Sequence, residues 1–227
     1  MNDQRLEEML MLGPGLRDGD GHLLAIGQEA SRILHDANIP HLVGGGVAVW
    51  AYGRYRHTKD IDLFLPVGKQ ILALDALARQ GFHTRETDAR WLYKGVKEEV
   101  SIDLIIFTTG DIRLDADTLA HGRSCEVRDF RFNLMGPEDV LLRKIHSANE
   151  ARFHDWYDGL SILKRVFAAE VEFDWHYFVR LAGNYGIERT LAFIFFALSD
   201  QGPQAVPDWV LQQLLATSES VPDVSRH

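Results

Sequence analysis

The sequence predicts an α+β (α/β) fold, in which a mixed sheet flanked by helices is followed by an all-helical C-terminal half. In the first part, short runs of β-branched and aromatic residues alternate with longer helix-like segments, an order typical of a sheet covered by helices. From Pro137 to Ala216 the hydrophobic residues recur with a helical period. We therefore expect an α/β domain with N-terminal helices over 1–135, a helical domain over 136–217 and a flexible tail over 218–227.

The α/β part reads as a regular succession of elements. Helices are expected at 1–12, 18–38, 47–52 and 68–80, and strands at 41–43, 59–65, 82–85, 91–94 and 100–107. A turn is expected near 97–99 and a hairpin around Asp129, whereas 108–122 fits neither pattern. Pro40 ends the second helix and Gly81 ends the fourth.

Two aspartates lie two positions apart in the strand expected at 59–65. Because side chains alternate faces along a strand, Asp60 and Asp62 project to one side, while Ile61 and Leu63 project into the core. Two close carboxylates repel each other unless a cation lies between them, and their burial without a partner is costly. Mg²⁺ takes carboxylate oxygens and keeps coordination positions for substrate phosphates. The pair therefore predicts a magnesium site, with outward charges on an edge strand as the alternative.

Three glycines, Gly44, Gly45 and Gly46, open the short helix expected at 47–52. A glycine-rich turn at a helix N-terminus presents N–H groups and the positive end of the helix dipole, which suit a phosphate group. A tight turn alone would also explain the glycines, but the aspartates downstream favour phosphate contact. Together the two features predict one site for a metal-bound nucleoside triphosphate.

A glycine pair, a short helix, a polar loop and an Asp-apolar-Asp strand in this order resemble the polymerase-β-like nucleotidyltransferase superfamily. The family pattern has a third carboxylate on a later strand, and Asp103 in the β-prone run 100–107 matches it. Residues 56–60, Arg-His-Thr-Lys-Asp, are similar to the Arg-x-Ser/Thr-x-Asp sequence of the branch that includes the abortive-infection toxins of type IV toxin–antitoxin systems. The resemblance implies that Arg56 and Thr58 line the nucleotide site.

A second block of residues carries the same resemblance. Residues 136–144 resemble the helical Pro-Glu-Asp-Leu…Lys segment of that branch, and residues 152–158 resemble its Arg-x-x-Asp-x-x-Asp segment. The resemblance implies a phosphate contact for Lys144 and a catalytic carboxylate at Asp155, with Asp158 as the alternative. An ion pair between the arginine and an aspartate of this segment is the purely structural explanation.

Composition indicates a cytoplasmic enzyme. The chain has a single cysteine, Cys125, which suits a reducing compartment. Its start lacks the basic and apolar regions of a signal peptide, and its longest apolar run, 191–198, is too short for a membrane span. The net charge of −9 argues against a broad basic surface for nucleic acid. We expect no membrane partner.

We therefore expect a Mg²⁺-dependent nucleotidyltransferase that transfers NMP from an NTP to an acceptor hydroxyl with release of pyrophosphate. ATP binding is expected, and two Mg²⁺ ions, with Mn²⁺ as the alternative, would be held by Asp60, Asp62 and Asp103. The catalytic groups would be these three aspartates with Lys144 and Asp155, and the NTP would contact Gly44, Gly45, Gly46, Arg56, Thr58 and Lys144. The acceptor stays open between a tRNA, a protein hydroxyl and a small molecule such as an aminoglycoside. The toxin-like branch implies a cognate antitoxin as a further partner.

Two other functions fit parts of the sequence. A nucleotide-binding module without catalysis, acting through a partner, would use the glycine turn but would not need three aspartates. A metal-dependent phosphohydrolase of the HD type is suggested by His146, His154, Asp155 and Asp158. These four residues come from one short helical region, whereas such sites draw their ligands from several helices.

Overall fold

The computed structural model describes residues 19–220 of the chain. The helix expected at 1–12 lies outside the described residues, as does the part of the expected tail from 221 to 227. The chain divides into two compact units. Unit 1 comprises the described residues up to Phe107 together with Arg113–Met135, and unit 2 comprises Thr108–Ile112 and the described residues from Gly136 onward.

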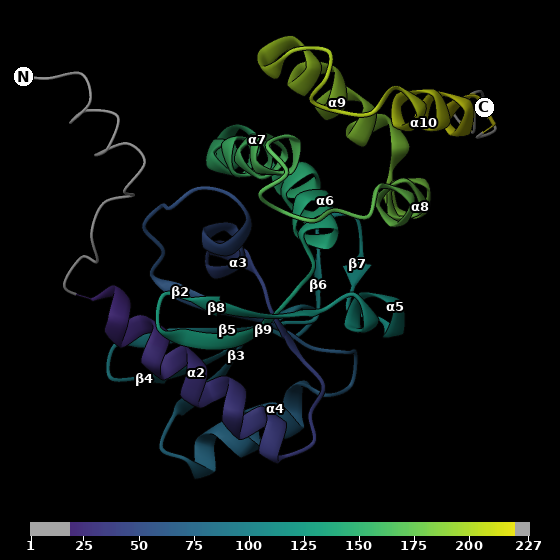
Figure 1. Ribbon diagram of the computed structural model, residues 1–227. Helices are drawn as coiled ribbons and strands as arrows, with labels where there is room; N and C mark the ends of the chain where they lie inside the picture. Colours follow the sequence, from purple (N-terminus) through teal and green to yellow (C-terminus); the bar gives the residue numbers. More distant parts are fainter. Residues whose placement is uncertain (1–18, 221–227) are drawn as a thin grey trace, which may run out of the picture. The chain divides into compact units, whose positions relative to one another are not determined.

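Unit 1 is built on a seven-stranded mixed sheet (Figure 1). Its strands are β1 (Leu42–Val43), β2 (Asp60–Phe64), β3 (His83–Asp88), β4 (Leu92–Lys97), β5 (Val100–Ile105), β8 (Arg123–Val127) and β9 (Phe130–Leu134). They lie side by side in the order β3-β4-β5-β2-β1-β9-β8. β2 is parallel to β5 and β1 to β9, while the other neighbours are antiparallel. The mixed α/β fold predicted from the sequence is confirmed.

Helices cover both faces of this sheet (Figure 1). The helices of unit 1 are α2 (Asp20–Asp36), α3 (Gly45–Tyr52), α4 (Gln70–Arg79) and α5 (Ala116–Ala120). α2 and α4 lie on one face and α3 lies on the other (Figure 1). α2 comes close to the sheet because Gly27 packs directly against the Ile61 side chain, where a β-carbon would be only 2.8 Å away. Since Ile61 points to α2, its neighbours Asp60 and Asp62 point to the face that carries α3.

A two-residue turn fixes the register between β4 and β5. Glu98 and Glu99 have φ values of 48° and 66°, the left-handed conformation that a tight hairpin between twisted strands requires at both positions. The turn pairs Lys97 with Val100, and counting outward from it places Lys94 opposite Asp103. The turn expected near 97–99 is confirmed, as is the hairpin around Asp129 that joins β8 to β9.

Unit 2 is helical over most of its described residues. Its helices are α6 (Pro137–Ser147), the 3-10 helix η1 (Glu150–Arg152), α7 (Phe153–Phe167), α8 (Trp175–Tyr185), α9 (Ile187–Gln201) and α10 (Asp208–Ser220). They enclose an apolar core that includes Leu141, Ile145, Leu163, Tyr177, Phe178, Phe193 and Ile194. Gly159 lets α7 approach α9, since a β-carbon there would lie 2.9 Å from the Phe193 ring. The helical period predicted from Pro137 is confirmed, and it continues to Ser220.

The segment 108–122, which fitted neither pattern, contains two short strands and a short helix. β6 (Phe107–Thr108) and β7 (Ile112–Arg113) form a separate two-stranded ladder. α5 follows, and the Asp115 side chain caps it by accepting a hydrogen bond from the Thr118 backbone N–H at 2.8 Å. None of the helices within residues 19–220 is long and apolar enough to cross a membrane.

Candidate active site

Three aspartates of unit 1 lie on two neighbouring strands of the sheet. Asp60 and Asp62 stand on β2, and both are half-buried. Asp103 stands on β5 directly opposite Asp62 in the parallel register, and it is only 7% exposed. Residues paired in this way project from the same face of a sheet, so the Asp62 and Asp103 side chains are neighbours. The shared face predicted for Asp60 and Asp62 is confirmed by the burial of the residues between and after them.

The glycine turn packs against side chains from β2 and from the loop before it. Each glycine faces a side chain that leaves no space for a β-carbon: Gly44 faces Phe64, Gly45 faces Asp62 and Gly46 faces Thr58. Gly45 also has a φ of 54°, which other residues adopt at a cost. The N-cap residue of α3 is Gly44, and no side-chain capping bond is made there within the described residues, so the first backbone N–H groups of the helix are not satisfied in that way. The turn thus brings an uncapped helix N-terminus next to the Asp62 carboxylate.

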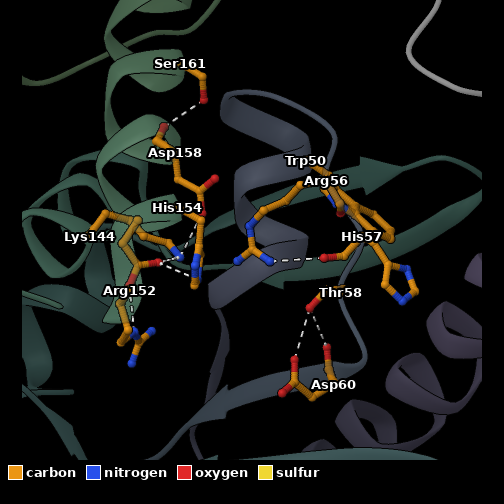
Figure 2. A network of polar contacts seen from close by, with 11 residues as sticks. Trp50, Arg56, His57, Thr58, Asp60, Lys144, Arg152, His154, Asp158 and Ser161 are labelled. Carbon is orange, nitrogen blue, oxygen red and sulfur yellow. Dashed lines mark hydrogen bonds and ion pairs between the residues drawn. The ribbon is translucent and has the colours of Figure 1, made fainter. Parts of the chain in front are cut away.

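The loop before β2 holds the Asp60 carboxylate in place (Figure 2). The buried Thr58 hydroxyl donates a hydrogen bond to Asp60 Oδ1 at 3.0 Å. Arg56 donates from its guanidinium to the His57 carbonyl oxygen at 3.2 Å, and its own carbonyl oxygen accepts the Trp50 indole N–H at 2.6 Å. Trp50 belongs to α3, so the loop is tied to the helix that begins at the glycine turn. Asp60 is therefore oriented before any ligand binds.

Asp103 has two partners that the sequence pattern did not reveal. The Lys94 ammonium, which comes from β4, lies 2.7 Å and 2.9 Å from the two carboxylate oxygens of Asp103. The Ser101 hydroxyl donates a third hydrogen bond, to Asp103 Oδ1, at 2.9 Å. The Lys94 and Asp103 side chains are 20% and 11% exposed, so this ion pair is largely screened from water. The hairpin turn at Glu98 is the sequence feature from which this pairing could have been found.

The aspartates differ in what they can offer a metal ion. Two carboxylates plus substrate phosphates and water are a usual set of ligands for Mg²⁺, and Asp60 and Asp62 fit this set. Asp103 already contacts an ammonium with both of its oxygens. Within residues 19–220, no three His, Cys, Asp or Glu side chains are arranged so that together they could hold an ion. The chemistry of the donors therefore supports a metal position at Asp60 and Asp62.

Unit 2 carries a second charged cluster, which Lys144, Arg152 and two aspartates form (Figure 2). Lys144 on α6 is 6% exposed, and its ammonium lies 2.6 Å from Asp155 Oδ1 and 3.1 Å from Asp158 Oδ2. The two aspartate side chains, both on α7, are fully buried. Arg152 adds a contact from Nε to Asp155 Oδ2 at 2.8 Å. Each of the two carboxylates has a cation beside it, and buried charges are tolerated when they are paired in this way.

The contact between Arg152 and Asp155 is the ion pair of the purely structural explanation for the segment 152–158. The two histidines of the region differ in environment. His146 is 5% exposed, and burial, together with the nearby Arg189 guanidinium, lowers the pKa of its imidazole against the effect of a backbone hydrogen bond at Gly186. The His154 side chain is about half exposed and lies 3.5 Å from Asp155 Oδ1.

A sequence profile of the family described as "nucleotidyl transferase of unknown function" (DUF2204) matches residues 24–177. The matched region is well over half of the 227-residue chain, and it contains the glycine turn, the three aspartates and the Lys144 cluster. The chain belongs to this family of nucleotidyltransferases. No curated protein sequence matches it. The resemblance to polymerase-β-like nucleotidyltransferases is confirmed, and the toxin branch stays a prediction.

Solved structures are similar to this nucleotidyltransferase to different degrees. The solution structure of the antibiotic-resistance factor ANT(2'')-Ia is 16% identical with a TM-score of 0.51, over 66% of this chain and 87% of that chain. A nucleotidyltransferase-like protein from Paracoccidioides brasiliensis is 17% identical with a TM-score of 0.44, over 64% and 77% of the two chains. ANT(2'')-Ia in complex with adenylyl-2''-tobramycin is 12% identical with a TM-score of 0.43, over 86% and 97%. The first likeness shows a common fold, and the two others are too weak to add to it.

The Lys144 cluster bears on the phosphohydrolase alternative for this nucleotidyltransferase. Asp155 and Asp158, two of its four suggested ligands, both bind the Lys144 ammonium. That ammonium supplies the positive charge that a metal ion would otherwise provide between them. The family and the cluster both favour nucleotidyl transfer over metal-dependent hydrolysis.

Proposed function

We propose that this nucleotidyltransferase transfers NMP from an NTP such as ATP to an acceptor hydroxyl and releases pyrophosphate. The observation that carries the proposal is the position of Asp62, which lies opposite Asp103 in the sheet and against Gly45 at the start of α3. One region of unit 1 thereby contains two carboxylates that would bind a cation, those of Asp60 and Asp62. It also contains the Asp103 carboxylate, which would accept a proton, and the N-terminus of α3, which would bind phosphates.

Asp60 and Asp62 are the residues that would hold Mg²⁺, with Mn²⁺ as the alternative ion. When bound, such an ion offsets the charge of the triphosphate and polarises the phosphoryl group under attack. The protein's own part is orientation, since Thr58 fixes the Asp60 carboxylate and Gly45 leaves space for that of Asp62. Loss of one carboxylate should lower the rate by about 10²–10⁴.

The phosphates of the NTP would bind at the glycine turn. Backbone N–H groups of residues 44–46 at the start of α3 would donate to phosphate oxygens, with the Arg56 guanidinium as a further donor. In unit 2, Lys144 is proposed as an additional phosphate contact that Asp155 holds in position. An ammonium has three N–H donors, and the two carboxylates beside Lys144 use two of them, so one remains for a phosphate oxygen.

The chemical step would be an in-line displacement at the α-phosphorus. A bond forms between the acceptor oxygen and the α-phosphorus, while the bond from that phosphorus to the bridging oxygen of the β-phosphate breaks. The bond electrons leave with pyrophosphate, and the proton of the acceptor hydroxyl passes to the Asp103 carboxylate. Catalysis of this kind depends on positioning and on charge stabilisation.

Three classes of acceptor are compatible with this chemistry. The net charge of −9 favours a cationic small molecule, such as an aminoglycoside, or a protein hydroxyl over a long nucleic acid. The toxin-like second block favours a tRNA, and in that case we also propose a cognate antitoxin as a partner.

Transfer of radioactive label would test the proposal. The protein is incubated with each α-³²P-labelled NTP and Mg²⁺ in the presence of cellular RNA, protein or small-molecule fractions, and the fraction that takes up label identifies the acceptor class. Asp62→Asn should abolish labelling, whereas Asp36→Asn, which changes an exposed aspartate on α2, should not. NTP binding without labelling of any fraction would support the catalytically silent module. Hydrolysis of the NTP without an acceptor would support the phosphohydrolase.

A further inference from the structure

Asp103 contacts a fixed positive charge with both of its oxygens. Lys94 lies directly opposite it in the antiparallel register of β4 and β5, so the sheet itself delivers the ammonium to the carboxylate. The two N–O distances are 2.7 Å and 2.9 Å. A carboxylate has about four lone-pair positions, and Lys94 together with the Ser101 hydroxyl takes three of them.

A second divalent cation at Asp103 does not fit this arrangement. It would need carboxylate oxygens that Lys94 and Ser101 already contact, and it would stand beside a like charge that is shielded from water. The situation at Asp60 is different, because the Thr58 hydroxyl bound to it is neutral and leaves the negative charge of the carboxylate in place. The donor set thus suits one divalent cation at Asp60 and Asp62, and an ammonium at Asp103.

We propose that Lys94 takes the place of a second metal ion at Asp103, so that this nucleotidyltransferase works with one divalent cation, held by Asp60 and Asp62. The inference rests on the proposed function, because it requires those two aspartates to be the metal site. Lys94 acts here as a positioning residue, because its ammonium holds the Asp103 carboxylate in one orientation. Lys94, Asp103 and Asp62 are paired across the neighbouring strands β4, β5 and β2, so the ammonium also adds positive charge close to Asp62.

Counting bound Mn²⁺ ions tests the inference without reference to activity. The full chain is titrated with Mn²⁺, and the free ion is measured by electron paramagnetic resonance. The wild-type protein should bind one ion at the aspartates. Lys94→Met frees the oxygens of Asp103 and should bind a second ion about 10- to 100-fold more tightly than the wild type does, the range seen when groups that contact metal ligands are changed. Lys94→Arg keeps the charge and should behave as the wild type.

Lys97→Met is the matched control. Lys97 stands on the same strand, its ammonium lies 2.8 Å from Glu29, and its side chain is 23% exposed, close to the 20% of Lys94. This variant should bind one ion. Circular dichroism and the melting temperature show whether each variant is folded, and Lys94→Gln is the second neutral variant in case the methionine variant does not fold.

The outcomes separate this inference from the proposed function. Two ions bound by the wild type, or no gain in the folded neutral Lys94 variants, would overturn the role of Lys94 and leave the proposed function standing. Asp62→Asn should lose the first ion. If it binds that ion as the wild type does, the metal site of the proposed function is wrong whatever Lys94 does. Binding of no Mn²⁺ by any of the proteins would overturn both.

Discussion

The carboxylate of Asp62 occupies the space that a side chain at position 45 would need, since a β-carbon on Gly45 would overlap Asp62 Oδ2. The N-terminus of α3 can therefore lie against β2 only because a glycine stands at this position. The positive φ of 54° at Gly45 is a second requirement for glycine, and it is independent of the first. The glycine turn and the proposed metal ligand are thus parts of one arrangement, in which a change at one is felt at the other.

Replacement of Gly45 by alanine should therefore damage metal binding as well as phosphate binding. We expect Gly45→Ala to displace the Asp62 carboxylate, to abolish Mn²⁺ binding at that site and to lower transfer by about 10²–10³, as for loss of an electrostatic group at a reacting phosphate. Gly68→Ala is the matched control, because Gly68 has a φ of 87° and has no neighbour within 4 Å of a β-carbon. Both variants carry backbone strain of about 1 kcal/mol. Equal Mn²⁺ affinity in the two variants would show that the overlap with Asp62 has no consequence.

The sequence was sufficient for those parts of the site that depend on local patterns. Alternation along β2 placed Asp60 and Asp62 on one face, and the glycines marked the start of α3. The pairing of Lys94 with Asp103 was not foreseen, because it depends on the exact hairpin register. The turn that sets this register consists of Glu98 and Glu99, which are not the Asn or Gly residues that mark such turns.

The burial of Lys144 could not be predicted from the sequence, for a related reason. A lysine on an amphipathic helix is usually placed on the surface by its pattern. Only the packing of α6 against α7 shows that two fully buried aspartates surround it. Contacts between helices are tertiary, and the periodicity of one helix does not specify which residues of another helix it meets.

The ion pair between Lys94 and Asp103 predicts coupled effects on stability. Asp103→Asn leaves the poorly exposed Lys94 ammonium without its counter-charge and should lower the free energy of unfolding by about 1–3 kcal/mol. Lys94→Met should lower the free energy of unfolding much less in the Asp103→Asn protein than in the wild type, which corresponds to a coupling energy of about 1–2 kcal/mol between the two residues. Urea unfolding of the four proteins measures this cycle. Additive effects would mean that the contact contributes nothing to stability, and the double variant should remain inactive in transfer.

Stability should also depend on pH through His41 in unit 1. Burial lowers the pKa of the His41 imidazole, and nearby His35 acts in the same direction, while a hydrogen bond to the Ile39 carbonyl opposes both. The unfolded chain therefore takes up a proton at higher pH than the folded chain does. The contribution of His41 to the free energy of unfolding is complete at pH values above about 6.5, the pKa of histidine in the unfolded chain. It falls as the pH decreases through that value towards the lower pKa of the folded protein.

Chemical denaturation at about pH 7.5 and about pH 5.5 would measure this slope. His41→Asn retains a hydrogen-bond donor towards the Ile39 carbonyl but does not titrate, so the slope should become smaller. It should not vanish, because the pKa of His146 in unit 2 is lowered as well. A slope that is the same in the His41 variant as in the wild type would show that His41 does not contribute.

The role of Lys144 needs a variant that keeps the buried charges balanced. Lys144→Ala removes the ammonium that contacts the buried Asp155 and Asp158 and leaves the contact of Arg152 with Asp155, so it should destabilise the protein by about 3–5 kcal/mol. Loss of transfer in that variant would not distinguish a phosphate contact from a damaged fold. Lys144→Met combined with Asp158→Asn removes one charge of each sign and leaves the ion pair between Arg152 and Asp155. We expect this double variant to recover most of the lost melting temperature.

If Lys144 binds a phosphate, the double variant will be folded and still transfer label at least about 10²-fold more slowly than the wild type. The matched control is Arg165→Met with Glu170→Gln, which removes a pair of opposite charges 2.9 Å apart at the C-terminal end of α7, where the two side chains are 34% and 57% exposed. This control should leave transfer unchanged. If transfer in the Lys144 double variant returns together with the melting temperature, Lys144 serves only to neutralise the two aspartates. The catalytic groups would then all come from unit 1, and the second block of the toxin-like resemblance would reflect the packing of α6 on α7.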